Sequence, residues 1–335
     1  MNGTVEIVEL DAPSLEGNPL GDPTRRAMPV YLPPGYEGGN ERFPVVYFLH
    51  GFTGSGTKWV GFPGFGVTVP QRIDHLISSG AIPPVIAVFP DGWTAIGGSQ
   101  WINSEAIGRY GDYLAKDVVA WVDRELRTVA KAEGRACVGT SSGGYGALVA
   151  GRDHPDVFGH VASHSGDAYF EYGYLQDLPK AAGAVLKAGG VEEWFNDFWK
   201  RSRETKSRNE DHAVLNALAM AAAYSPKKGE PMYIELPFDR ETARIKPDVW
   251  ARWLEHDPVR FIPRSAAAFR SLKSVFVDCG VRDEFNLRWG ARMVVEELRK
   301  IGVDVAHEEF EDGHMGINYR YDRSMQYLAP RLARS

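Results

Sequence analysis

Cysteine is scarce in this sequence, which contains only Cys137 and Cys279 among 335 residues. Both lie in apolar runs that predict buried strands, so we expect reduced thiols in the core and exclude a disulfide-rich scaffold. Long hydrophobic runs are also missing. Because a helix needs about 18 or more apolar residues in a row to cross a bilayer, the sequence predicts no membrane span.

A secretory leader and an excess of positive charge are absent as well. The first six residues have neither a basic start nor an apolar stretch, and we therefore expect a cytoplasmic location. Lysine and arginine total 38 against 44 acidic residues, for a net charge of -6. Since binding to phosphates needs a basic face, nucleic acid is not an expected partner.

The hydrophobic and charged fractions, 44% and 24%, are those of a soluble globular protein. Short apolar runs alternate with amphipathic stretches, which is typical of parallel strands joined by crossover helices. We expect strands over residues 28–32, 45–49, 84–89, 135–138, 161–163, 275–278 and 305–310, and helices over 112–126, 143–151, 287–301 and 319–328. The fold class is therefore α/β, with a mostly parallel central sheet and helices on both faces.

Residues 167–263 interrupt this rhythm. Strand-like runs become rare there, and aromatic helical segments such as Trp194–Trp199 replace them. The segment is too long for a loop and has no linker composition. We expect a helical insertion before the acid-bearing strand, serving as a lid or pocket wall within a single domain of residues 1–335.

A candidate nucleophile, Ser141, follows the predicted strand 135–138 in the run Gly139-Thr140-Ser141-Ser142-Gly143-Gly144. The bare G-x-S-x-G pattern is weak in a glycine-rich chain, but a strand before it and a small-residue helix after it predict a nucleophile elbow. Ser142 is the alternative nucleophile. It lacks a glycine two residues before it, so its expected role is to supply a backbone N–H.

A serine nucleophile needs a general base and an acid that orients it. Of nine histidines, His314 lies between glycines directly after the predicted last strand, where the base of an α/β hydrolase belongs. His307 falls inside that strand, and the others precede the candidate acid. Asp283 is that acid, because it follows strand 275–278 and a turn; Glu284 and Asp278 are the alternatives.

A tetrahedral intermediate also needs donors for its negative oxygen. We expect the backbone amides of Ser142 and of Phe52, which lies in the glycine-rich loop after strand 45–49. Glycines in that loop would also suit phosphate binding. Lys58 is outside the P-loop frame, however, which disfavours that interpretation.

Taken together, these residues resemble the putative esterase family, which includes esterase D (S-formylglutathione hydrolase), feruloyl and acetyl-xylan esterases, enterochelin esterase and the antigen 85 mycolyltransferases. The motifs that carry the resemblance span nearly the whole chain: VYLPPGY at 30–36, Leu49-His50-Gly51, the run at 139–148, Asp278-Cys279-Gly280 with Asp283, and Gly313-His314. The resemblance implies an α/β-hydrolase fold and a triad of serine, acid and histidine. Departures are Ser142, where methionine often follows the nucleophile, and the long segment 167–263.

The expected function is hydrolysis of a carboxylic ester through an acyl-enzyme on Ser141. Acyl transfer with the same triad and a catalytically dead binding protein of this fold are the alternatives. Trp101 and Tyr145 are candidate substrate contacts, although aromatic residues here could equally belong to the core. Without an H-E-x-x-H or a Cys/His cluster, no metal or cofactor is expected. The expected partner is a small-molecule or carbohydrate-linked ester, and the sequence leaves a homo-oligomer open.

Overall fold

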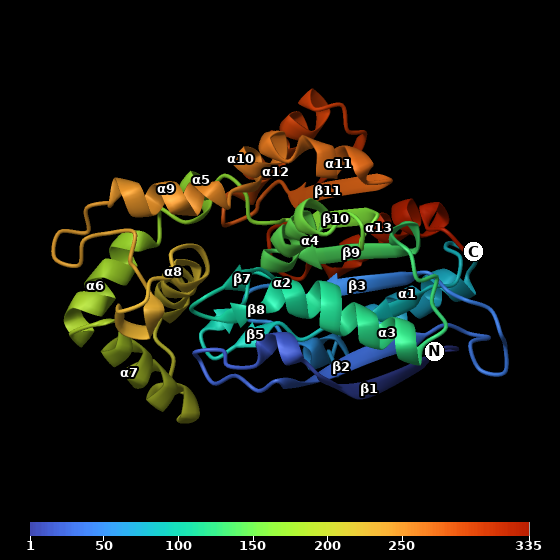
Figure 1. The fold of residues 1–335 in the computed structure, drawn as a ribbon, viewed down its shortest axis with the longest axis horizontal. Coiled ribbons are helices and arrows are strands. Elements are labelled where there is room, and N and C mark those ends of the chain that lie inside the picture. The colour runs from blue at the N-terminus through green and yellow to red at the C-terminus, as the bar shows by residue number, and fades with distance from the viewer. Residues whose placement is uncertain (335) are drawn as a thin grey trace.

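An eight-stranded, mostly parallel sheet forms the centre of the molecule (Figure 1). The computed structural model describes residues 1–334. In spatial order the strands are β1 (Thr4–Asp11), β2 (Arg25–Leu32), β4 (Ile86–Val88), β3 (Val45–Leu49), β9 (Arg135–Thr140), β10 (His160–His164), β11 (Ser274–Gly280) and β12 (Val305–Phe310). Strand β2 pairs antiparallel with β1 and β4, and the remaining pairs are parallel. The predicted α/β class with a mostly parallel sheet is confirmed.

Helices cover both faces of this sheet, as expected for parallel strands with continuous apolar sequences. Helices α1 (Val69–Ser78) and α13 (Tyr321–Leu328) pack on one face. Helices α3 (Val119–Glu125), α4 (Ser142–Asp153) and α12 (Leu287–Lys300) pack on the other. Every residue of β3 is buried, which agrees with its uninterrupted run of apolar side chains.

The chain between β10 and β11 is helical. Its helices are α5 (Phe170–Gly173), α6 (Leu178–Ala188), α7 (Val191–Arg203), α8 (Asp211–Tyr224), α9 (Pro247–Glu255), α10 (Pro258–Arg264) and α11 (Ala266–Ser271). Figure 1 shows α6 to α9 gathered in a lobe at one side of the sheet, opposite the two chain termini. The apolar side chains of α8 are packed in this lobe, since thirteen of its fourteen residues are buried. A helical insertion before the strand of the candidate acid is therefore present.

Three parts of the fold differ from the sequence-based expectations. Strand β1 was not predicted, because as an edge strand it exposes most of its residues and its apolar residues do not alternate regularly with polar ones. The expected helix 112–126 consists of α2 (Tyr110–Asp112), a π-helical turn and α3. Residues 93–109 form two small hairpins, β5 (Trp93–Thr94) with β6 (Gly97–Gly98) and β7 (Asn103–Ser104) with β8 (Gly108–Arg109).

No helix within residues 1–334 combines the length and the apolar character needed to cross a bilayer.

Candidate active site

Ser141 lies at the sharp turn between β9 and α4. Its backbone angles, φ 58° and ψ -127°, are a conformation that residues with a side chain rarely adopt. The strain is held in place from both sides, because the Ser141 amide donates to the His164 carbonyl at 2.9 Å and its carbonyl accepts from Tyr145 at 2.9 Å. Gly143 lets the turn form, since a β-carbon there would overlap the carbonyl oxygen of Leu49.

Asp283 and His314 form a hydrogen-bonded pair. The Nδ1 atom of His314 lies 2.8 Å from Oδ2 of Asp283, and both side chains are buried. The other carboxylate oxygen accepts from the amides of Phe285 at 3.0 Å and Leu287 at 3.3 Å, which fixes the plane of the carboxyl group. Because an ionised carboxylate can only accept, the proton of the imidazole belongs on Nδ1, and Nε2 is left with a free lone pair.

Glu284 holds the histidine loop rather than the imidazole. Its carboxylate accepts a hydrogen bond from the backbone amide of His314 at 2.7 Å. The ring of Phe285 packs edge-on against His314 with its centroid 4.8 Å away. The backbone and the ring of the base are thus each held by a neighbouring side chain, and Glu284, the alternative acid of the sequence analysis, has a different place in the site.

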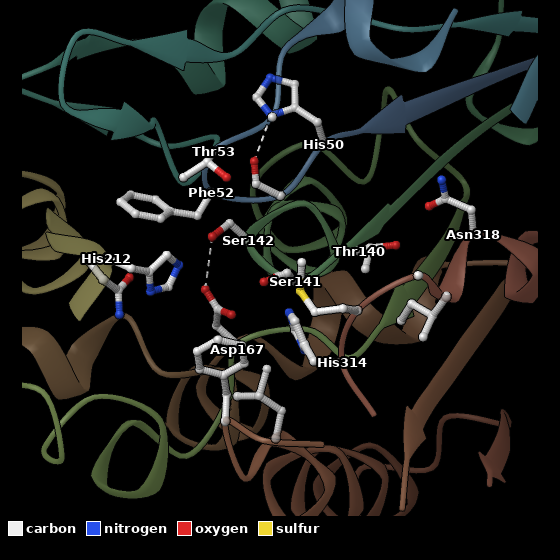
Figure 2. Close-up of a pocket in the computed structure, with 18 of the residues that line it drawn as sticks. His50, Phe52, Thr53, Thr140, Ser141, Ser142, Asp167, His212, His314 and Asn318 are labelled. Atoms are coloured by element: carbon white, nitrogen blue, oxygen red, sulfur yellow. Dashed lines mark hydrogen bonds between the residues drawn. The ribbon is translucent and has the colours of Figure 1, made fainter. Parts of the chain in front are cut away.

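Ser141 and His314 line one cavity of about 310 Å³. Figure 2 shows Ser141 near the centre of the view, with the His314 ring directed toward it. Among residues 1–334 the Ser141 hydroxyl has no hydrogen-bond partner, so it can rotate toward the imidazole or a substrate. The structure thus gathers Ser141, Asp283 and His314, which are up to 173 residues apart in sequence, at the same edge of the sheet, where the parallel strands end.

The two candidate oxyanion donors also belong to this cavity. Ser142 is the first residue of α4, and Phe52 lies in the loop after β3. Within the described residues neither backbone amide donates to a protein acceptor, so both remain available to a ligand. His50 shapes the turn before Phe52: its Nε2 accepts from the Gly92 amide at 2.9 Å, and its Nδ1 donates to the Gly51 carbonyl at 2.8 Å.

Trp101 and Tyr145 are not brought to the cavity. Trp101 is 2% exposed, packs against Gly92 and Gly146, and donates from Nε1 to the His50 carbonyl at 3.2 Å. Tyr145 is fully buried among aromatic rings of the core, including those of Phe170 and Tyr224. Aromatic content alone predicted contact with a substrate, but the depth of each ring depends on packing that the sequence does not display.

Other cavity residues were missed by the sequence analysis. Asp167 follows β10, and His212 and Asn216 come from α8 in the helical lobe. Burial raises the pKa of Asp167, and hydrogen bonds from Gln100 and Tyr174 offset only part of this effect. A signal for Asp167 existed, because it lies just beyond the carboxyl end of a central parallel strand, where ligands bind in such sheets. The two α8 residues carried no comparable signal.

A second Ser, His and Asp constellation lies on the face of the sheet that α13 covers. His164 Nδ1 is 2.7 Å from Oδ1 of Asp278, and its Nε2 is 2.9 Å from the hydroxyl of Ser324. All three side chains are inaccessible to solvent, and Arg320 occupies the other oxygen of Asp278 at 2.9 Å. Since no substrate can reach it, this group stabilises the packing of α13 on the sheet.

Comparisons with known proteins point to one family. The model of the family described as "Putative esterase" matches residues 23–312. Among curated proteins, Esterase Rv1288 of Mycobacterium tuberculosis is 28% identical over 181 residues, which are 52% of this chain and 37% of that protein. The Endo-1,4-beta-xylanase/feruloyl esterase of Xylanibacter ruminicola is 31% identical over 168 residues, 49% of this chain and 22% of that protein. The chain thus spans less than two-fifths of the length of these relatives.

Solved structures extend the similarity to the whole chain. A ferulic acid esterase superposes with a TM-score of 0.63 and 19% identity over 99% of both chains. An S-formylglutathione hydrolase from Agrobacterium tumefaciens gives a TM-score of 0.59 and 15% identity over 99% of this chain and 96% of that one. At such identities the likeness concerns the fold, and it confirms the predicted α/β-hydrolase architecture.

Proposed function

The chain belongs to the putative esterase family, and on that premise we propose that it is a serine esterase that hydrolyses carboxylic esters through an acyl-enzyme on Ser141. The observation that carries the proposal is the buried Asp283–His314 pair, joined at 2.8 Å, opening on the cavity that Ser141 lines. The strained elbow of Ser141 adds support, because such a turn raises the hydroxyl above the sheet.

In the first half of the proposed reaction, Nε2 of His314 accepts the hydroxyl proton of Ser141 while Oγ attacks the ester carbonyl. The carbonyl oxygen becomes an oxyanion, and the amides of Phe52 and Ser142 donate to it. When the intermediate collapses, the bond to the alcohol oxygen breaks, and the imidazolium of His314 returns its proton to that oxygen. The alcohol leaves, and the acyl group remains on Ser141.

In the second half, a water molecule attacks the acyl-enzyme. His314 takes one proton from the water, and the new tetrahedral intermediate releases the carboxylic acid and restores the Ser141 hydroxyl. Asp283 keeps the proton on Nδ1 throughout and stabilises the imidazolium that forms in each half. An alcohol in place of water would make the same enzyme an acyltransferase, so the acceptor alone separates the two activities.

Hydrolysis of p-nitrophenyl esters from acetate to octanoate tests this proposal. We expect measurable turnover by the native protein and a loss of at least about 10³-fold in kcat for Ser141→Ala. Ser324→Ala is the matched control, because it removes the serine of the buried constellation, and it should keep the native kcat. Turnover that survives in Ser141→Ala would contradict the nucleophile assignment, and adding glycerol would reveal acyl transfer as a glyceryl ester.

A further inference from the structure

Asp167 is a buried carboxyl group in the cavity that the proposed reaction does not use. It is 7% exposed and lies beside the elbow. Its Oδ2 atom accepts three hydrogen bonds, from Nε2 of Gln100 at 2.9 Å, the hydroxyl of Tyr174 at 2.9 Å and the hydroxyl of Ser142 at 3.2 Å. Its Oδ1 atom accepts none from residues 1–334. Figure 2 shows the bond from Ser142 and the other oxygen on the side of Ser141 and His314.

The three hydrogen-bond donors around Oδ2 determine which oxygen of Asp167 can bind a ligand. They occupy Oδ2 and prevent the carboxyl group from turning, so Oδ1 stays directed into the cavity. Gln100, which makes one of these contacts, is fully buried and has a strained backbone. Its φ of 54° is in the left-handed region that residues with a side chain rarely adopt. An acceptor fixed in this way is a feature of a binding site rather than of a core.

The charged side chains around the cavity limit which ligand groups can donate a hydrogen bond to Oδ1 of Asp167. Asp167 is the only carboxyl group among the described residues that line the cavity. Lys58 lines the same cavity, with Nζ on the Thr53 carbonyl at 2.7 Å, and the imidazoles of His212 and His314 face it as well. A cationic ligand would be repelled by the lysine, whereas a hydroxyl group is neutral and donates one hydrogen bond.

We propose that Oδ1 of Asp167 accepts a hydrogen bond from a hydroxyl group of the substrate, which makes the enzyme selective for hydroxylated esters. This inference rests on the proposed esterase function. A site built to bind a hydroxyl rejects the analogue that lacks it, because the buried acceptor is then left without a partner.

Two matched pairs of esters test the selectivity of the native protein. In the first pair the hydroxyl is on the acyl part: methyl 3-(4-hydroxyphenyl)propanoate against methyl 3-phenylpropanoate. In the second it is on the alcohol part: 3-hydroxypropyl butanoate against propyl butanoate. We expect kcat/KM at least about tenfold higher for the hydroxylated member of one pair or both, and the pair that responds identifies the part of the substrate that Asp167 contacts.

The variant Asp167→Asn tests whether Asp167 causes this selectivity. The amide oxygen should take the place of Oδ2, where three donors converge, and the NH₂ group should then face the cavity and present a donor in place of the acceptor. We expect the selectivity ratio to fall at least about tenfold, because kcat/KM should decrease more for the hydroxylated ester than for the hydroxyl-free one. Asp167→Ala, which adds no donor, should also lose the selectivity.

Asp257→Asn is the control, because it makes the same change in a buried carboxyl group that lies outside the cavity, at the start of α10. Its selectivity ratio should remain native. Equal kcat/KM within both pairs for the native protein, or a native ratio in Asp167→Asn, would overturn the inference while leaving the esterase proposal intact. Turnover of p-nitrophenyl esters but of none of the four esters would also overturn the inference alone. Failure of the native protein to hydrolyse the p-nitrophenyl esters and all four of these esters would instead contradict the proposed function.

Discussion

Accessibility separates the two Ser, His and Asp constellations of this molecule. The group of His164, Asp278 and Ser324 has the shorter His–Asp distance, 2.7 Å against 2.8 Å for His314 and Asp283. It is nevertheless enclosed on all sides, whereas His314 opens on a cavity. At the scale of single residues, hydrogen-bond geometry therefore does not identify a catalytic group unless a substrate can reach it.

Asp283→Asn should lower kcat by about 10⁴-fold with little change in KM. The amides of Phe285 and Leu287 would hold the new amide oxygen where Oδ1 is now, so the NH₂ group would face Nδ1 of His314. The imidazole proton would then move to Nε2, which could no longer accept the proton of Ser141. Steady-state kinetics with a p-nitrophenyl ester measure the effect.

The matching change in the buried constellation, Asp278→Asn, should lower the free energy of unfolding and leave kcat within a few-fold of native. A native kcat in Asp283→Asn together with a large loss in Asp278→Asn would transfer the role of the acid to Asp278.

At the scale of elements, the elbow depends on how closely α4 approaches β3 and β9. Gly139 and Gly143 face each other there, and a β-carbon on Gly139 would overlap the backbone of Gly143. Helix α4 starts with small residues and is buried through Gly151, so the sheet itself determines its path. The strained backbone of Ser141 is a consequence of this packing rather than of its own preference.

Gly143→Ala should destabilise the protein by about 1–3 kcal/mol or more, because the added methyl overlaps the Leu49 carbonyl. Gly183→Ala in α6 is the matched control: a β-carbon there meets no atom within 4 Å, and alanine should stabilise the helix by about 0.5–1 kcal/mol. Unfolding in guanidinium chloride measures both. Equal stabilities for the two variants would show that α4 can move away from β3 without loss.

At the scale of the whole molecule, the sheet and the helical lobe build the cavity together. Loops at the strand ends supply the candidate catalytic residues, and α8 supplies His212 and Asn216 on another wall. The predicted role of residues 167–263 as a lid or pocket wall stays a prediction. Each part also holds a histidine removed from solvent: His160 is buried in β10, and the half-buried His256 follows α9 and stacks on Tyr224 with centroids 5.0 Å apart.

The stability of the protein should fall as the pH drops from about 6.5 to about 4. Burial lowers the pKa of His160 and of His256 to about 4. Since the unfolded chain binds these protons at higher pH than the folded one, the stabilisation is complete above the ordinary histidine pKa and is lost on acidification. Each group should contribute roughly 1–3 kcal/mol. Urea unfolding across this range measures the effect.

His160→Gln isolates one of these contributions. Glutamine can still accept from Ser274 and donate to the Glu133 carbonyl, as His160 does, but it does not titrate. Its stability should depend less steeply on pH between 6.5 and 4. The raised pKa values of Asp167 and Asp257 increase stability on acidification, equally in the native protein and in His160→Gln. If the pH dependence of stability were the same in both proteins, His160 would not contribute to it.

Local patterns in the sequence were sufficient for the α/β class, most core strands and the residues now gathered at the cavity. Strand ends and the glycines around Ser141 are encoded within a few residues, because backbone geometry and strand burial depend on neighbours along the chain. The order of Ser141, Asp283 and His314 along the whole chain matched that of α/β hydrolases. Their catalytic roles remain proposals.

Only the tertiary structure decided what surrounds these residues. It buried Trp101 and Tyr145 in the core, brought His212 into the cavity from a lobe far along the chain, and left one oxygen of Asp167 free. It also enclosed His164 and Asp278 beneath α13, a contact that no local pattern in the sequence indicates. Depth and accessibility depend on contacts between distant segments, and no local pattern of residues records them.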